Sequence, residues 1–284
     1  MSEIEQKWDT VIEPKTGLFR LDLKEIWKFR DLFSLFVKRD IITQYKQTVL
    51  GPLWFIIQPI LTTIMQVVIF KGVAKMSTDG LPAILFYMSG NVFWGYFSEC
   101  ITKTSSTFNT NAAIFGKVYF PRMIAPLSTV ASNLVRFAIQ MALFIAFYIY
   151  FIATGTPISP NIYLLMFPLL VLMLAGLALG FGVIVSSMTT KYRDLAILFT
   201  FIVQLWQYAT PVIYPMSFIE NSTLKLAINL NPLTPIFEAF RYGALGVGSF
   251  SWWGLTYSFG FMIVVLLLGT MVFNRVQRSF MDTV

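Results

Sequence analysis

Apolar residues dominate six stretches of the chain, and shorter polar segments separate them. In order, these stretches cover residues 51–70, 81–101, 124–153, 162–188, 195–213 and 252–273. An α-helix needs about 20 apolar residues to cross roughly 30 Å of hydrocarbon. Because backbone polar groups must be satisfied without water inside a bilayer, helices are the simplest solution for such segments. The pattern therefore predicts an all-α integral membrane protein with six transmembrane helices.

Proline and glycine refine two of these spans. Pro52 suits the first turn of a helix that begins at Gly51, and Pro59 is expected to kink the same helix because it removes one backbone hydrogen bond. In the fourth span, small residues predict close contact with a neighbouring helix. These residues are Gly176, Gly180 and Gly182.

A segment of mixed apolar and basic residues, 21–41, precedes the first span. Its pattern predicts an amphipathic helix at the membrane surface. A helix of a small soluble domain is the alternative, which the short flanking segments disfavour. We expect residues 1–50 to form a cytoplasmic segment with this helix, and residues 51–284 to form one six-span transmembrane domain.

Basic residues are distributed unevenly between the two sides of the predicted spans. The chain holds 21 lysines and arginines, and its first fifty residues show no signal peptide. With the N-terminus in the cytoplasm, only Lys71, Lys75, Lys225 and Arg241 lie outside, and Arg136 lies in the third span. This positive-inside bias predicts that both termini are cytoplasmic, and it explains the net charge of +7 without nucleic acid.

Composition removes several classes of function. Hydrophobic residues make up 56% of the chain and charged residues only 12%, against about 25% charged in soluble domains. The chain has no histidine and a single cysteine, Cys100, so we expect no metal site and no cysteine–histidine catalysis. It also lacks the GxxxxGK[ST] loop that cradles ATP, so active transport would require a separate ATPase chain.

Two charges fall within the predicted membrane zone. Glu99 lies near the end of the second span and Arg136 within the third. Ionisable groups are costly in lipid and usually face a partner or water. The two side chains are therefore expected either to pair with each other or to face a pore.

Two of the segments that connect the predicted spans contain many apolar residues. Residues 102–123 mix small polar side chains with aromatic ones, which predicts either docking on a partner or a cytoplasmic extension of a long helix. Residues 211–249 contain apolar pieces too short to cross a bilayer, broken by proline and glycine. They predict re-entrant half-helices near the outer face, with an ordinary extracellular loop as the alternative. The candidate outer-gate residues are Pro211, Tyr214, Pro232, Glu238 and Arg241.

Aromatic residues make up 17% of the chain. Interfacial belts and core packing account for most of them. Aromatic faces also stack on sugar rings, so a channel lined with rings would let a glycan slide through. The candidate channel residues are Trp54, Phe55, Tyr87, Phe93, Trp94, Tyr96, Phe97, Trp206 and Tyr208.

Several motifs resemble one transporter family along almost the whole chain. The most specific is RDIITQYKQTVLGPLWFIIQP, from Arg39 to Pro59. KVYFPR, KYRDL, PVIYP and the NPLTP to RYG region follow in the same order. Together they resemble the membrane subunit of ABC-2 type ABC transporters, especially the polysaccharide-export branch.

The resemblance implies a homodimer joined to two copies of a separate ATPase, which would bind ATP and Mg, with no cofactor or catalysis in this chain. It implies export of a lipid-linked glycan across the inner membrane of a bacterium, with O-antigen favoured over capsule or teichoic acid. The amphipathic helix would be the interface helix. The implied coupling and gate residues are Asn109, Phe115, Lys117, Tyr119, Arg122, Lys191, Arg193 and Asp194.

Three alternatives remain open. A polytopic glycosyltransferase would show catalytic charge clusters on its loops, where Glu220 and Glu238 are sparse. A secondary flippase usually has more spans and internal repeats. An ABC-2 exporter of drugs or other lipids would share the architecture without the aromatic channel.

Overall fold

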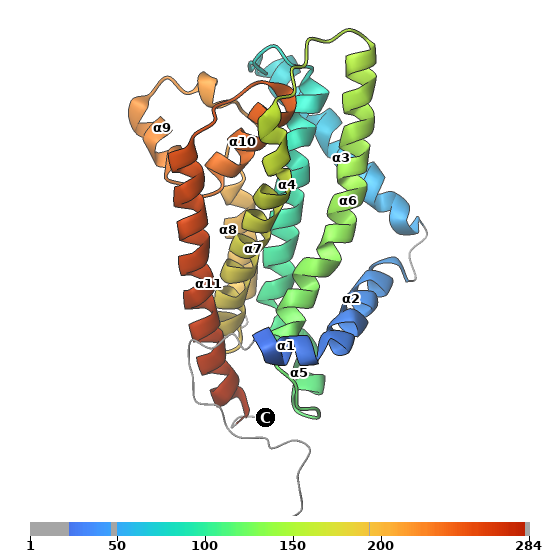
Figure 1. The fold of residues 1–284 in the computed structure, drawn as a ribbon, viewed down its shortest axis with the longest axis vertical. Helices are drawn as coiled ribbons and strands as arrows, with labels where there is room; N and C mark the ends of the chain where they lie inside the picture. The colour runs from blue at the N-terminus through green and yellow to red at the C-terminus, as the bar shows by residue number, and fades with distance from the viewer. Residues whose placement is uncertain (1–22, 47–49, 193, 282–284) are drawn as a thin grey trace, which may run out of the picture.

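The computed structural model describes residues 23–46, 50–192 and 194–281, and this part of the chain is helical without a strand. Long helices stand side by side, with short helices at both ends of the bundle (Figure 1). In chain order the elements are α1 (Leu23–Lys28), α2 (Arg30–Tyr45), η1 (Gly51–Leu53), α3 (Trp54–Gln66), η2 (Val67–Val73), α4 (Ala83–Ser105), α5 (Thr107–Phe115), α6 (Ile124–Ala153), η3 (Ile162–Met166), α7 (Phe167–Thr189), α8 (Leu195–Trp206), η4 (Met216–Phe218), α9 (Ser222–Asn229), α10 (Thr234–Leu245) and α11 (Trp252–Met281).

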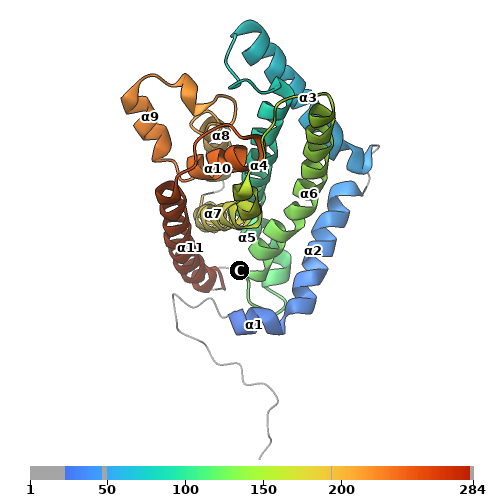
Figure 2. The same cartoon turned by 45° about the horizontal axis from the view of Figure 1, so that its top comes forward.

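Helices α4 and α7 form the centre of the bundle. They pack against each other, α7 packs against α11, and α4 packs against α6, which in turn holds α2 (Figure 2). The main hydrophobic core accordingly takes most of its buried residues from α4, α7 and α10. Helix α3 lies at the side of the bundle, and most of its apolar surface is exposed.

Small residues allow the central helices to approach closely. A Cβ atom at Gly180 would lie 2.8 Å from Val265 of α11, and one at Gly182 would lie 2.6 Å from Thr104 of α4. No real side chain tolerates such contacts without movement of its neighbour. The close packing predicted for the fourth span is therefore confirmed.

Four helical segments in the described residues are long and apolar enough to cross a membrane. They are Gly51–Val73, Ile124–Ala153, Ile162–Thr189 and Trp252–Gln277, and they correspond to the first, third, fourth and sixth predicted spans. The second predicted span forms α4, which is long enough at 23 residues but is less apolar than these four. The fifth forms α8, whose helix has only 12 residues.

The structure differs from the sequence prediction in two places. The segment predicted as one amphipathic helix is divided into α1 and α2, because the chain turns at Phe29. The fifth predicted span was expected to continue to Ile213, but α8 ends at Trp206 and the chain continues in turns. Between α8 and α11 lie the short elements η4, α9 and α10.

Candidate functional site

The functional candidates gather at the two ends of the bundle. We call the end that contains α1, α5 and the last turns of α11 the α5 end, and the end that contains α9 and α10 the α10 end (Figure 1). The predicted coupling residues lie at the α5 end, and the predicted outer-gate residues lie at the α10 end. The two groups can therefore be considered separately.

Aromatic side chains at the α5 end form a cluster that joins distant segments. Phe115 of α5 packs against Phe120 at 5.7 Å between ring centroids, and Phe120 packs against Phe36 of α2 at 5.6 Å. Phe108 of α5 lies 4.7 Å from Phe273 of α11. These contacts join α2, α5 and α11 in one packed unit.

Arg122 reinforces this unit between α5 and α11. Its guanidinium lies over the Phe115 ring at 5.3 Å and donates a hydrogen bond to the backbone carbonyl of Gln277 at 3.1 Å. The side chain is buried, and burial lowers the pKa of Arg122 from its usual range. Because the usual pKa of arginine lies far above neutral pH, Arg122 keeps its charge there and links the Phe115 ring to the last turns of α11.

The other coupling candidates in this region are exposed. Asn109, Lys117 and Tyr119 lie on α5 and on the loop between α5 and α6, with their side chains toward solvent. The structure thus divides the predicted set into a buried part, Phe115 and Arg122, and an exposed part. The exposed part is the one that a partner chain can reach.

The segment between α7 and α8 also lies at the α5 end. The Thr189 hydroxyl donates to the Ser105 carbonyl at 2.8 Å, which holds the end of α7 against the end of α4. Lys191 and Asp194 beyond it are exposed. Arg193, also predicted for coupling, lies outside the described residues.

The two charges predicted within the membrane zone form an ion pair. Arg136 of α6 lies 3.0 Å from the Glu99 carboxylate of α4, and Lys103 lies 2.9 Å from the same group. Arg136 also donates to Gln58 of α3 at 3.0 Å and lies over the Phe55 ring at 5.2 Å. These contacts join α3, α4 and α6. Glu99 and Arg136 thus pair with each other, which was one of the two expectations from the sequence. The other expectation, that they face a pore, stays a prediction.

Most of the candidate channel aromatics are buried inside the subunit. The Phe93 ring of α4, for example, packs at 4.4 Å from Phe240 and at 5.8 Å from Phe137. The five candidates on α4, all buried, are Tyr87, Phe93, Trp94, Tyr96 and Phe97. In the structure these five side chains pack in the core, which the sequence analysis gave as the alternative to lining a channel.

The four remaining aromatic candidates differ in exposure. Trp206 at the end of α8 packs on Phe97 at 5.4 Å, and Phe55 is buried. Trp54 and Tyr208 keep 48% and 62% of their surfaces exposed. Among the predicted channel residues, these two are the most exposed, and contact with a glycan stays a prediction.

A buried arginine organises the α10 end. Arg241 of α10 is 1% exposed and donates hydrogen bonds to the carbonyls of Pro211 and Val212, at 2.5 and 2.7 Å. It also lies over the Phe86 ring at 4.0 Å, and Glu238 lies 3.8 Å away. This arrangement fastens the segment after α8 to α4 and α10.

The other predicted outer-gate residues lie around the same segment. Pro211 and Pro232 are buried, and Tyr214 is partly exposed and donates to the Tyr208 carbonyl at 2.9 Å. Glu238 accepts hydrogen bonds from the backbone and side chain of Ser249. Arg241 thus joins Pro211 and Glu238, and gating by the five candidates stays a prediction.

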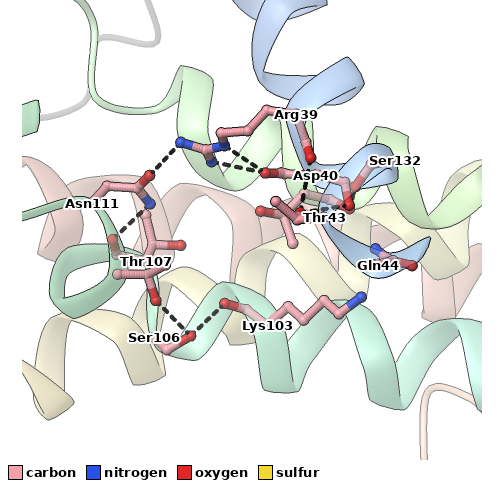
Figure 3. Close-up of a pocket in the computed structure, with 11 residues that line it drawn as sticks. Arg39, Asp40, Thr43, Gln44, Lys103, Ser106, Thr107, Asn111 and Ser132 are labelled. Atoms are coloured by element: carbon pink, nitrogen blue, oxygen red, sulfur yellow. Dashed lines mark hydrogen bonds and ion pairs between the residues drawn. The ribbon is translucent and has the colours of Figure 1, made fainter. Parts of the chain in front are cut away.

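Sequence reasoning missed a polar cavity at the α5 end, between α2, α4, α5 and α6 (Figure 3). Arg39 and Asp40 belong to the motif that carried the family resemblance, but they were not assigned a site. Asp40 pairs with Arg39, and Arg39 also bonds Asn111 of α5, 72 residues further along the chain. A local pattern offers no signal for such a cavity, except that polar residues recur on one side of α2.

The four long apolar helical segments of the described residues, with an ion pair between α4 and α6, define a multi-pass helical membrane protein. The family model of the ABC-2 type transporter matches residues 31–245, about three quarters of the chain. This chain therefore belongs to the ABC-2 type transporter family.

Curated relatives have similar lengths and more specific names. The chain is 27% identical to an O-antigen export system permease protein RfbA of Myxococcus xanthus, over 77% of this chain and 82% of the relative. It is 26% identical to an RfbA protein of Klebsiella pneumoniae, over 89% and 94%. A capsule polysaccharide export inner-membrane protein CtrC of Neisseria meningitidis serogroup A is 23% identical, over 90% and 98%.

Proposed function

We propose that this chain is the membrane permease of an ABC exporter that moves lipid-linked polysaccharide, with O-antigen as the favoured cargo, across the inner membrane of a bacterium. The observation that carries the proposal is similarity to O-antigen export permeases along up to 89% of the chain. The chain has the length and helical architecture of a permease, and ATP hydrolysis is assigned to a separate ATPase subunit with its own Mg.

Capsular polysaccharide is the second candidate cargo. The CtrC relatives support it, because one of them matches 90% of this chain, although its identity is lower than that of the RfbA proteins. Teichoic acid and non-glycan lipids remain further alternatives without a supporting relative here.

The proposed topology has six spans, with both termini in the cytoplasm. Helix α4 supplies the second span, because its 23 residues can cross the hydrocarbon while its polar side chains face other helices. Helix α8 and the turns that follow it supply the fifth. Residues 1–50 form the cytoplasmic segment with α1 and α2 as interface helices, and α9 and α10 are half-helices at the outer face.

The proposed assembly is a homodimer of this chain with two ATPase subunits. The exposed residues at the α5 end, Asn109, Lys117 and Tyr119, with Lys191 and Asp194 beside them, form the ATPase contact. Closure of the ATPases on ATP would push α5, and the aromatic cluster with Arg122 would carry that movement to α2 and α11. Translocation of the glycan follows from separation of the two subunits along their exposed apolar helices, including α3.

Co-purification from mild detergent tests this assignment. We expect a tagged chain to retain a second subunit with a phosphate-binding loop at equal stoichiometry, and the mixture to hydrolyse ATP. Lys117→Glu at the proposed contact should reduce recovery of the ATPase, whereas Lys225→Glu on α9 at the opposite end should not. If the chain purifies alone and the preparation does not hydrolyse ATP, the proposal is refuted, and a secondary carrier or a membrane enzyme becomes the better assignment.

The cargo requires a separate cellular test. Deletion of the gene should make lipid-linked glycan accumulate on the inner side of the membrane, and re-expression of this chain should restore surface glycan. Loss of surface O-antigen with intact capsule supports the favoured cargo, and the reverse result supports the second candidate.

A further inference from the structure

A polar cavity of about 240 Å³ opens at the α5 end between α2, α4, α5 and α6 (Figure 3). Every residue that lines it is polar or charged, although 56% of the whole chain is hydrophobic. Its walls come from the segment before the first span and from three helices of the bundle. Polar side chains that are shielded from water need hydrogen-bond partners, so the cavity suits a polar group at the end of the membrane region.

Two cations face this cavity with hydrogen-bond donors to spare. Arg39 donates through Nε and Nη2 to Asp40 and through Nη1 to Asn111, which leaves one N–H on each terminal nitrogen. Lys103 bonds Glu99 and Asn133, and its ammonium has a third donor. The Gln44 amide faces the cavity without a hydrogen bond to the described residues (Figure 3). Such donors suit phosphate oxygens.

Hydroxyl groups supply the opposite polarity. Thr43 donates to the Arg39 carbonyl, Thr107 to the Thr104 carbonyl and Ser132 to the Thr129 carbonyl, at 2.7 to 3.0 Å. Because each of these hydroxyl groups donates its proton to a backbone carbonyl, its oxygen keeps a lone pair that can accept a hydrogen bond. Asp40 adds a carboxylate. The cavity therefore accepts hydrogen bonds as well as donating them.

The balance of charge selects between two kinds of ligand. Asp40 offsets Arg39, and Glu99 offsets part of the charge that Lys103 and Arg136 share, so the cavity has only a modest net attraction for a bare phosphate. A group that carries both a phosphate and hydroxyl donors would use both sets of partners. At about 240 Å³, below the 300–1,000 Å³ typical of drug-sized ligands, the cavity fits a single head group.

We propose that this cavity binds a sugar phosphate head group carried by a lipid, with the phosphate on Arg39, Lys103 and Gln44 and the sugar hydroxyls on the acceptors of α2, α5 and α6. The inference rests on the proposed function, because a lipid-linked glycan presents that chemistry where its sugar joins its lipid carrier. It places recognition of the carrier at the junction of α2 with the bundle.

The test measures binding of a short isoprenyl diphosphate that carries one hexose to the full chain with its co-purified partners, in nanodiscs of phosphatidylcholine. Lys103→Met should raise Kd about tenfold or more, because a charge-assisted hydrogen bond is lost. This variant should still fold, since Arg136 continues to pair Glu99. Ser132→Ala should raise Kd about three- to tenfold.

Matched controls keep the readout specific. Lys38→Met removes an exposed charge one residue from Arg39, outside the cavity, and Ser128→Ala removes a hydroxyl one turn from Ser132 with the same internal hydrogen bond. Both should leave Kd within about twofold. If the cavity variants behave like these controls, or wild type binds no probe, the proposal is overturned.

Two further probes identify the source of the phosphate. The same isoprenyl diphosphate without its sugar should bind more weakly than the sugar-bearing probe, and equal affinity would overturn the role of the sugar. Phosphatidylglycerol in the nanodisc should not compete, and competition that depends on Lys103 would assign the cavity to a phospholipid head group instead. ATP hydrolysis by the same preparation is measured in parallel, so an intact ATPase complex without probe binding refutes this inference and leaves the proposed function standing.

Discussion

Gly90 on α4 provides a sharp test of the packing around Arg241. A Cβ atom at this position would lie 2.6 Å from the Val212 carbonyl oxygen and 3.0 Å from Nη2 of Arg241. Arg241 donates its hydrogen bond to the same carbonyl. Alanine must therefore displace either the backbone after α8 or the buried guanidinium, and both movements loosen the charged hydrogen bond between them.

The magnitude follows from three contributions to the free energy of unfolding. Overpacking a tight site costs about 1–3 kcal/mol. Weakening a hydrogen bond to a charged group costs about 1.5–3 kcal/mol when the bond is lost. Alanine in place of glycine favours the helix by about 1 kcal/mol and offsets part of this. We expect Gly90→Ala to destabilise the protein by about 2–4 kcal/mol.

Gly95→Ala on the same helix is the matched control. Its Cβ atom would lie 3.5 Å from the nearest neighbour, the Gln140 amide oxygen, which is an ordinary contact. Thermal unfolding in detergent should place Gly90→Ala well below wild type and Gly95→Ala at or slightly above it. If the two variants have the same unfolding temperature, the hydrogen bonds of Arg241 to the segment after α8 do not constrain the α10 end as described.

Three further predictions concern other candidates. Arg122→Ala should lower the unfolding temperature, since it loses the Gln277 hydrogen bond and the Phe115 contact, about 1–3 kcal/mol in total, which a melting curve would show. Trp94→Ala should cost about 3–5 kcal/mol because the side chain is buried, and a variant as stable as wild type would contradict core packing. Tyr208→Ala, at an exposed position, should leave melting unchanged but reduce glycan export if the ring lines the path, and normal surface glycan would remove it from the channel.

Local pattern was sufficient for the long helices. The third predicted span has the same bounds as α6, and the apolar run of the fourth continues through η3 and α7. These segments are defined by continuous hydrophobicity, which is a property of neighbouring residues. The charged pair was also accessible, because an acid and a base in the membrane zone each need a partner and few are available.

The roles of the aromatic residues depend on contacts that no local pattern contains. Phe93 was a channel candidate because it lies in a span rich in rings, but it meets Phe137 of α6 and Phe240 of α10. A ring that lines a pore and a ring that fills a core have the same spacing along a helix. Only the packing of the remote helices α6, α7 and α10 distinguishes these two roles.

The conformation of the chain after α8 depends on a residue that is remote in sequence. The helical part of residues 195–213 is apolar except for Thr200 and Gln204, so a continuous span was the natural prediction. Yet α8 has 12 residues, or about 18 Å at 1.5 Å per residue. Leaving a helix inside an apolar environment exposes backbone carbonyls, and irregular backbone is tolerated there only when protein satisfies it.

Arg241 donates hydrogen bonds to the carbonyls of Pro211 and Val212 from α10, about thirty residues further along the chain. Gly90 leaves the space in which they meet. The early end of α8 is therefore a joint property of α4, the turns after α8 and α10. It follows that replacing Arg241 should disturb the backbone after α8 before it disturbs α10, and hydrogen exchange at Val212 compared with Phe237 would show which segment opens first.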